Sequence, residues 1–289
     1  MQTLDSVSHV GDYLGRWKLS DPELVAETPT SWVYRVMRRK IGPLALKLRR
    51  PGADAAEDHG GVMQEWYAGQ GAARVYALSD NAQLLEWLDG SPLSALVGQG
   101  KDDTATDIIC QVITQLHIPR DLPPPAMLIP LSQRFNELLT TNMVKWPSAA
   151  RDLLVRAQII ARKLLADMPP AKPLHGDLHH GNIMFSPRSW VAINANGILG
   201  DPAYEVASSF LHPMDMTDIV ADPERITALA DRFAARLGFE RGRMLGFAVA
   251  HSALSACREL KAGRPVKHHL AVLPRLLSAY ELASAQTTR

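Results

Sequence analysis

The chain has 289 residues, 46% of them hydrophobic, and its 31 basic side chains are nearly balanced by 30 acidic ones. A chain of this length usually divides its core between two domains or lobes. Its near-zero net charge excludes the strong overall field that draws proteins to nucleic acid or anionic membranes, so neither partner is expected and recognition of charge must be local.

The amino terminus and the cysteines favour a cytoplasmic location. Residues 1–12 lack the basic start and apolar run of a secretion signal, and no stretch of about 18 apolar residues occurs. Cys110 and Cys257 have no metal-ligand spacing. They are expected as free buried thiols in a reducing compartment.

Short strands dominate the first part of the chain, with one helix among them. A helical pattern covers residues 55–67 and ends before Gly69 and Gly71, which are common helix terminators. Alternating or apolar runs bounded by turn residues predict five strands at 24–27, 32–37, 43–48, 74–78 and 83–88. Three strands, a helix and two strands predict a small antiparallel sheet.

A break at residues 89–92 is followed by a helical period. A proline-rich connection at 119–130 and a loop-like segment at 173–202 separate the helical stretches. The apolar stripes that predict helices lie at 108–116, 153–165 and 226–237. We therefore predict an α+β protein with one lobe at 1–88 and a mainly helical lobe at 89–289.

The loop-like segment contains Leu-His-Gly-Asp-Leu-His-His-Gly-Asn at residues 174–182, which places Asp177 five positions before Asn182. Phosphoryl transfer uses such a pair, because the Asp accepts the proton of the attacking hydroxyl and the Asn oxygen helps hold magnesium. An isolated Asp and Asn would more often cap turns. The two glycines of the motif and the two-lobe pattern favour the functional interpretation. His175 and His179 have the spacing of a zinc-binding pair on a helix, but the glycines favour a loop and so disfavour a zinc site.

Two further blocks follow this motif without a gap: Trp-Val-Ala-Ile at 190–193 and Gly-Ile-Leu-Gly-Asp-Pro-Ala-Tyr-Glu at 197–205. Together the three blocks resemble the aminoglycoside/hydroxyurea antibiotic resistance kinases, above all the streptomycin 6-phosphotransferases. The resemblance implies a protein-kinase-like two-lobed fold, with a small antiparallel-sheet N-terminal lobe and a mainly helical C-terminal lobe. It also implies ATP as donor, Mg²⁺ as metal, and a small polar acceptor, which is expected to be a cationic aminoglycoside such as streptomycin.

The same resemblance assigns roles to single residues. Asp177 would be the catalytic base and Asn182 a metal ligand. Lys47, on the third strand, would bind the nucleotide phosphates. Glu57, on the following helix, would hold Lys47, and is preferred to Glu65 for this role.

Other positions would contact the nucleotide or the acceptor. Thr30 and Ser31 replace a glycine-rich turn and could offer hydroxyl and backbone N–H donors to phosphate. Glu86 and Leu88 fall in the lobe connection, where backbone groups would bind adenine. The expected acceptor-side residues, including the carboxylates that a polycation requires, are His180, Asp201 and Glu205. Asp201 could instead cap a helix that starts near residue 203.

One departure from the family affects the metal site. In the family the strand ending at Ile193 is followed by an Asp, the second magnesium ligand, whereas this chain has Asn194. The loss of a negative charge is expected to lower metal affinity. A nucleotide-binding protein without phosphotransfer and a kinase of another small metabolite, such as choline, therefore stay open as alternatives.

Overall fold

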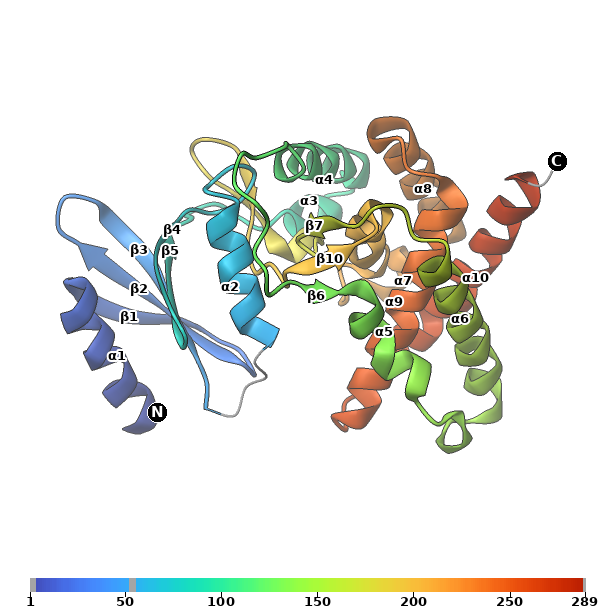
Figure 1. Cartoon of the computed structure of the whole chain (residues 1–289), viewed down its shortest axis with the longest axis horizontal. Helices are drawn as coiled ribbons and strands as arrows, with labels where there is room; N and C mark the ends of the chain where they lie inside the picture. Colours follow the sequence, from blue (N-terminus) through green and yellow to red (C-terminus); the bar gives the residue numbers. More distant parts are fainter. Residues whose placement is uncertain (1–3, 52–55, 288–289) are drawn as a thin grey trace.

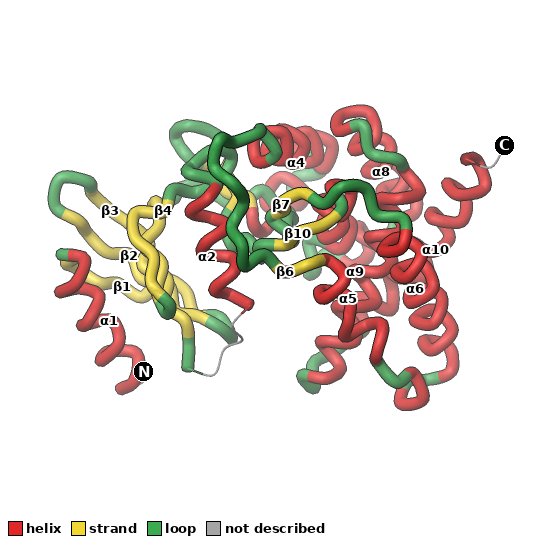
Figure 2. The backbone as a smooth tube through the Cα atoms, in the orientation of Figure 1, coloured by secondary structure: helices red, strands yellow, loops and turns green. Residues whose placement is uncertain are grey.

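The computed structural model describes residues 4–51 and 56–287. The larger group of strands lies in one half of the molecule and most of the helices lie in the other, with the two termini at opposite ends (Figure 1). The colouring by secondary structure shows the same division (Figure 2). None of the described helices is long and apolar enough to cross a membrane.

The expected antiparallel sheet is present and has five strands in the order β1-β2-β3-β5-β4. Its strands are β1 (Leu19–Glu27), β2 (Ser31–Arg38), β3 (Gly42–Arg49), β4 (Val75–Ser79) and β5 (Ala82–Glu86). Leu44, Leu46 and Leu48 of β3 are buried on one face. Because side chains alternate along a strand, Lys47 lies on the opposite face.

A helix that the sequence did not predict covers the leucine face of the sheet. This helix, α1 (Leu4–Trp17), packs Tyr13, Leu14 and Trp17 against the core of the sheet, and the Tyr13 hydroxyl lies 3.2 Å from Ser79 Oγ. Because Gly11 and Gly15 lower its helix propensity, this helix could not be recognised from the sequence. The opposite face of the sheet stays turned toward the rest of the molecule.

Helix α2 (Ala56–Trp66) follows the third strand, close to the expected bounds of 55–67. It contacts the turn after strand β9 (Trp190–Ala192) very closely. A Cβ added to Gly60 would lie 1.9 Å from the carbonyl oxygen of Ala195. Only glycine permits this approach between the helix and the turn.

The remaining chain is mainly helical and contains the largest apolar core. The expected stripes lie in α4 (Asp102–Leu116), α6 (Ser148–Ala166) and α8 (Pro223–Leu237), and Cys110 and Cys257 are free and buried. The other helical elements are α3 (Ser94–Gly98), α5 (Leu131–Thr140), η1 (Met143–Lys145), η3 (Pro202–Leu211), α7 (Thr217–Val220), α9 (Arg241–Lys261) and α10 (Lys267–Thr287).

The segment expected as a loop at 173–202 contains several very short strands. A sheet of order β6-β10-β7 joins β6 (Ile129–Pro130), β10 (Ile198–Gly200) and β7 (Lys172–Leu174), while β8 (Ile183–Phe185) pairs with β9. Each has two or three residues, too few to show a hydrophobic period. Strand β8 directly follows η2 (His180–Asn182), and β9 and β10 flank the turn at 194–197.

Candidate active site

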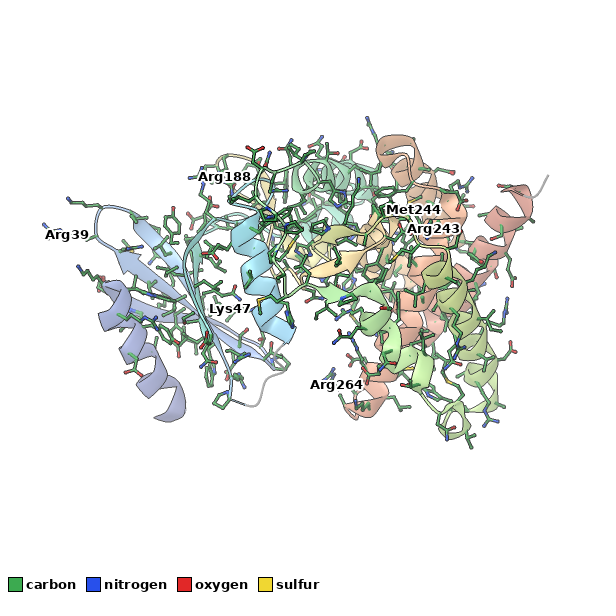
Figure 3. All side chains as sticks on the ribbon, viewed as in Figure 1. Arg39, Lys47, Arg188, Arg243, Met244 and Arg264 are labelled. Carbon is green, nitrogen blue, oxygen red and sulfur yellow. The ribbon has the colours of Figure 1, made fainter. Side chains whose placement is uncertain are left out.

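A cleft of about 290 Å³ lies between the sheet and the helical part. In Figure 3, Lys47 lies between the sheet and α2, at the side of this cleft. The cleft brings together residues from six separate segments: Thr28, Thr30, Ser31, Val33, Lys47, Gly60, Gln64, Gln83, Leu85, Asp177, His179, Asn182, Asn194, Ala195 and Asn196.

Asp177 is an ionised carboxylate on the wall of the cleft. Burial alone would raise its pKa, but His179, His251, His212 and Arg134 lower the pKa to about 2. The side chain keeps 29% of its surface exposed, so a molecule in the cleft can reach it. An ionised and accessible carboxylate is suited to accept a proton.

Asn182 and Asn194 join Asp177 to Lys47 across the cleft. Asn182 Nδ2 donates to the Asp177 backbone oxygen at 2.9 Å and lies 3.5 Å from Asp177 Oδ2. Asn194 Nδ2 donates to Asn182 Oδ1 at 3.2 Å, and Lys47 Nζ donates to Asn194 Oδ1 at 3.4 Å. Residues from β3, from the segment around Asp177 and from the turn at 194–197 therefore form one continuous polar chain.

The segment around Asp177 is braced by His175, as its place in the motif suggests. The His175 ring donates from Nε2 to the Ile193 carbonyl at 2.8 Å and accepts the Asp177 N–H at Nδ1. Asn196 N–H donates to the His175 carbonyl at 2.7 Å, and Ile193 N–H donates to the Asn182 carbonyl at 2.9 Å. These bonds tie the turn that carries Asn194 to the segment that carries Asp177.

Glu205 braces the same segment from behind, which corrects its expected place at the acceptor. It is buried, and its carboxylate accepts the N–H groups of His175 and Gly176 at 3.0 and 2.9 Å. Burial would raise the pKa of Glu205, but the His117 ring at 3.1 Å, the charge of His175 and the Gly176 bond lower it. His117 could not be predicted as its partner, because it lies 88 residues before Glu205 in the sequence.

Asp201 and His180, also expected on the acceptor side, are buried and do not line the cleft. Asp201 is 2% exposed, accepts the Ala203 N–H at the start of η3, and pairs with Arg243. The alternative interpretation of Asp201 as a helix cap is therefore confirmed. His180 is fully buried, 3.8 Å from Asp102, and burial lowers its pKa so that the ring is neutral.

The turn before β2 uses part of its own donor set. Ser31 N–H donates to Thr28 Oγ1 at 2.9 Å, and Thr30 N–H lies 3.4 Å from the same atom. The expected backbone donors to phosphate are therefore engaged within the turn. Thr30 is half-buried and lines the cleft, so its hydroxyl is placed to contact a ligand.

The lobe connection is organised by Arg188, another residue that the sequence did not single out. It pairs with Glu86 at 2.8 Å and donates to the carbonyls of Gly69 and Ala72. Burial would raise the pKa of Glu86, but this guanidinium lowers it. The Glu86 N–H donates to the Arg74 carbonyl, and Leu88 is half-buried just beyond β5.

The acid expected to hold Lys47 stays a prediction. Glu57 belongs to α2, but its side chain lies outside the described part of the structure. Glu65 borders a different pocket, which Lys47 also lines.

The oxygen atoms in the cleft fit magnesium better than a transition metal. Within the described residues, no three His, Cys, Asp or Glu side chains group so as to hold a metal ion. Asn182 and Asn194 instead bring two amide groups within 3.2 Å of each other beside the Asp177 carboxylate. Hard oxygen donors of this kind are those that magnesium prefers when phosphates supply its remaining ligands.

Comparison with known proteins matches residues 16–263 to the aminoglycoside/hydroxyurea antibiotic resistance kinase family. A streptomycin 3''-kinase of Klebsiella pneumoniae is 37% identical over 248 residues, covering 83% of this chain and 88% of that protein. A streptomycin 6-kinase of Streptomyces glaucescens is 27% identical over 265 residues, covering 88% and 83%.

Solved structures share the fold at low sequence identity. A thermostable mutant of aminoglycoside phosphotransferase APH(4)-Ia, in complex with AMP-PNP and hygromycin B, has a TM-score of 0.66 at 12% identity and covers 95% of this chain and 98% of that one. A choline/ethanolamine kinase family protein of Mesorhizobium loti has a TM-score of 0.65 at 15% identity, covering 91% and 88%. The expected protein-kinase-like fold is confirmed.

Proposed function

The chain belongs to the aminoglycoside/hydroxyurea antibiotic resistance kinase family, and we propose that it transfers the γ-phosphoryl group of ATP to a hydroxyl of an aminoglycoside such as streptomycin. The observation that carries this proposal is the polar chain from Asp177 through Asn182 and Asn194 to Lys47 within one cleft. This chain of contacts supports the proposal because it brings a carboxylate, two amide side chains and a cation together, and phosphoryl transfer uses a base, metal ligands and a cation.

In this reaction the acceptor hydroxyl gives its proton to the Asp177 carboxylate. The hydroxyl oxygen forms a bond to the γ-phosphorus while the bond from that phosphorus to the bridging oxygen of ADP breaks. Asp177 is ionised in the free protein, because its pKa of about 2 lies far below neutral pH. Lys47 would bind the phosphates and balance their charge from the opposite wall.

Asn182 and Asn194 would hold magnesium, which supplies charge neutralisation on the β- and γ-phosphate oxygens when it is bound. The pair would act as neutral ligands, since the family's second carboxylate is replaced by Asn194. Asp177 stays close enough to share the local field, 3.5 Å from Asn182 Nδ2. We therefore expect a lower affinity for magnesium than a carboxylate at position 194 would give.

The acceptor would be recognised by groups other than the carboxylates first expected. Asp201 is neutralised by Arg243, and Glu205 holds backbone N–H groups. The two streptomycin kinases that this chain resembles are named for different positions, 3'' and 6. The phosphorylated hydroxyl is therefore to be identified from the product. We infer a cytoplasmic location for this activity, because ATP is the proposed donor.

The open alternatives are less well supported than aminoglycoside phosphorylation. A protein that only binds nucleotide does not need an accessible ionised carboxylate. Asp177 is such a carboxylate, and it lies beside Asn182. A choline-type kinase is suggested only by structures below 25% identity, which support the fold alone.

The test is ATP consumption with and without streptomycin, in Mg²⁺ or Mn²⁺, with mass and NMR analysis of the product. Streptomycin-dependent release of ADP together with a singly phosphorylated streptomycin would support the proposal. Tight ATP binding without consumption in either metal would favour the nucleotide-binding alternative. Turnover with choline but not with streptomycin would favour the metabolite kinase.

A further inference from the structure

His179 presents a hydrogen-bond donor beside Asp177 that the reaction described above does not use. Its ring Nδ1 accepts the Gly181 N–H at 3.0 Å, at the start of η2. A neutral imidazole carries one proton, so an acceptor at Nδ1 places that proton on Nε2. Nε2 lies 3.9 Å from Asp177 Oδ2, which is longer than a hydrogen bond.

The ring of His179 is held firmly in this orientation. It stacks on His212 with ring centroids 3.7 Å apart and planes within 6°, and the His212 ring is itself fixed by a 2.8 Å bond from Nδ1 to the Ser208 carbonyl. A Cβ added to Gly181 would lie 3.1 Å from His179 Cε1, so the glycine permits the close fit. The donor is therefore preorganised before any ligand arrives.

The ring is neutral in the free protein. Burial lowers the pKa of His179, and the Asp177 carboxylate only partly offsets this effect. Only 16% of the side chain is exposed, and that part borders the cleft that also contains Asn182 and Asn194. Because Nδ1 is occupied by the Gly181 N–H, the neutral ring carries its proton on Nε2 and can donate it without first being charged.

We propose that His179 is a catalytic residue whose Nε2–H donates to an oxygen of the phosphoryl group while that group passes from ATP to the acceptor. The inference rests on the proposed phosphotransfer. Asp177 receives the acceptor proton, so the reacting phosphorus must pass close to Asp177 and hence to Nε2. Fixed hydrogen-bond donors stabilise the charge that develops on the phosphoryl oxygens. Because Asn194 replaces a carboxylate at the metal site, a donor such as Nε2–H would contribute more to this stabilisation.

Two substitutions separate the donor from the structural role of the ring. In His179→Asn the amide oxygen can still accept the Gly181 N–H, but nothing reaches the position of Nε2. In His179→Gln the amide nitrogen reaches that position as a donor, while the acceptor for Gly181 is lost. The pair is compared with wild type in streptomycin phosphorylation, in ATP hydrolysis by water, in melting temperature, and in affinity for ADP with aluminium fluoride, a planar mimic of the transferring phosphoryl group.

We expect His179→Asn to lower kcat by about 10²- to 10³-fold, the usual effect of losing one preorganised donor. Binding of ADP with aluminium fluoride should weaken by a similar factor, while affinity for ADP alone and the melting temperature stay near wild type. His179→Gln should recover at least tenfold of the lost kcat. Because the donor acts on the phosphoryl group, ATP hydrolysis by water should fall in parallel.

Unchanged affinity of His179→Asn for ADP with aluminium fluoride would overturn the inference. So would equal loss in both variants together with a lower melting temperature, because that result assigns His179 a structural role. If wild type fails to phosphorylate streptomycin, the proposed acceptor is wrong, but the aluminium fluoride comparison still tests His179. The two failures are therefore distinguishable.

Discussion

Asn194 donates from Nδ2 to Asn182 Oδ1 across 3.2 Å. The oxygen of the same amide faces Lys47 Nζ at 3.4 Å. Asn194 Nδ2 therefore faces the metal side of the cleft, and Asn194 Oδ1 faces the Lys47 ammonium group. To offer its oxygen to magnesium it must turn over and present its NH₂ group to Lys47, which repels that donor.

A carboxylate at position 194 would remove this conflict, because it has an oxygen on both sides. We expect Asn194→Asp to tighten Mg²⁺-dependent ATP binding by tenfold or more, since two unit charges about 4 Å apart attract by roughly 4 kcal/mol at an effective dielectric near 20. Phosphotransfer should also rise. Calorimetry at varied Mg²⁺ and steady-state kinetics measure both effects.

Asn196→Asp is the matched control, because Asn196 lines the same cleft and the change adds the same charge. A similar gain in Asn196→Asp would show that general negative charge, and not a ligand position, is responsible. No change in metal dependence or rate for Asn194→Asp would mean that position 194 is not a metal ligand.

Asp177→Asn should lower kcat by about 10²- to 10⁴-fold, the range typical for loss of a general base, with nucleotide affinity nearly unchanged. Asp215→Asn, in an exposed turn, is the control for removal of a carboxylate and should keep full activity. Full activity of Asp177→Asn would exclude the base assignment.

The pH dependence follows from the same carboxylate. A depressed pKa means that Asp177 is ionised above about pH 2 and becomes protonated only as the pH falls through that value. Wild-type kcat should therefore show no loss from Asp177 between pH 8 and pH 5. An acidic limb with a midpoint near pH 5 that disappears in a variant lacking Asp177 would contradict this assignment.

The sequence predicted the parts of this site that depend on local order. Asp177 and Asn182 are five residues apart in sequence and remain neighbours in the structure. The alternation of side chains in β3 places Lys47 on the face opposite the buried leucines. Contacts that arise only from packing were missed, such as the approach of Gly60 to Ala195. Arg188 and His117 were missed for the same reason, because their hydrogen-bond partners lie far away in the sequence.

The residues expected on the acceptor side are buried, for a physical reason. A charged residue next to a catalytic motif can face either the ligand or the interior, and hydrophobic periodicity does not distinguish the two in short irregular segments. Asp201 caps the start of η3 and Glu205 lies within it, and both side chains are buried. Their charges are balanced by Arg243 and His117, which the sequence places 42 residues later and 88 residues earlier.

Lys47→Ala should weaken ATP binding by about 10- to 100-fold, because a charge-assisted hydrogen bond contributes about 1.5–3 kcal/mol. Lys40→Ala removes the same charge from the exposed turn between β2 and β3 and should leave binding unchanged. Equal ATP affinity of Lys47→Ala and wild type, measured by calorimetry, would show that Lys47 does not bind the phosphates.

Glu205→Ala should destabilise the protein by about 3 kcal/mol or more, since each buried donor left without an acceptor costs about 1–3 kcal/mol. The donors affected are the N–H groups of His175 and Gly176 and the ring of His117. Denaturant unfolding measures this loss. Glu65→Ala, at an exposed position, is the control and should change stability little.

Gly60→Ala should separate α2 from the turn that carries Asn194. The new Cβ would lie 1.9 Å from the Ala195 carbonyl oxygen, whereas ordinary contact begins at 3.4 Å, so the helix or the turn must move by more than 1 Å. Because Asn194 links Lys47 to Asn182, this movement should weaken ATP binding about tenfold or more, although alanine favours a helix. Gly15→Ala is the matched control, since its Cβ meets no atom within 4 Å in α1, and it should leave stability unchanged or raise it by up to about 1 kcal/mol. If Gly60→Ala binds ATP like wild type, the contact between α2 and the turn does not position Asn194.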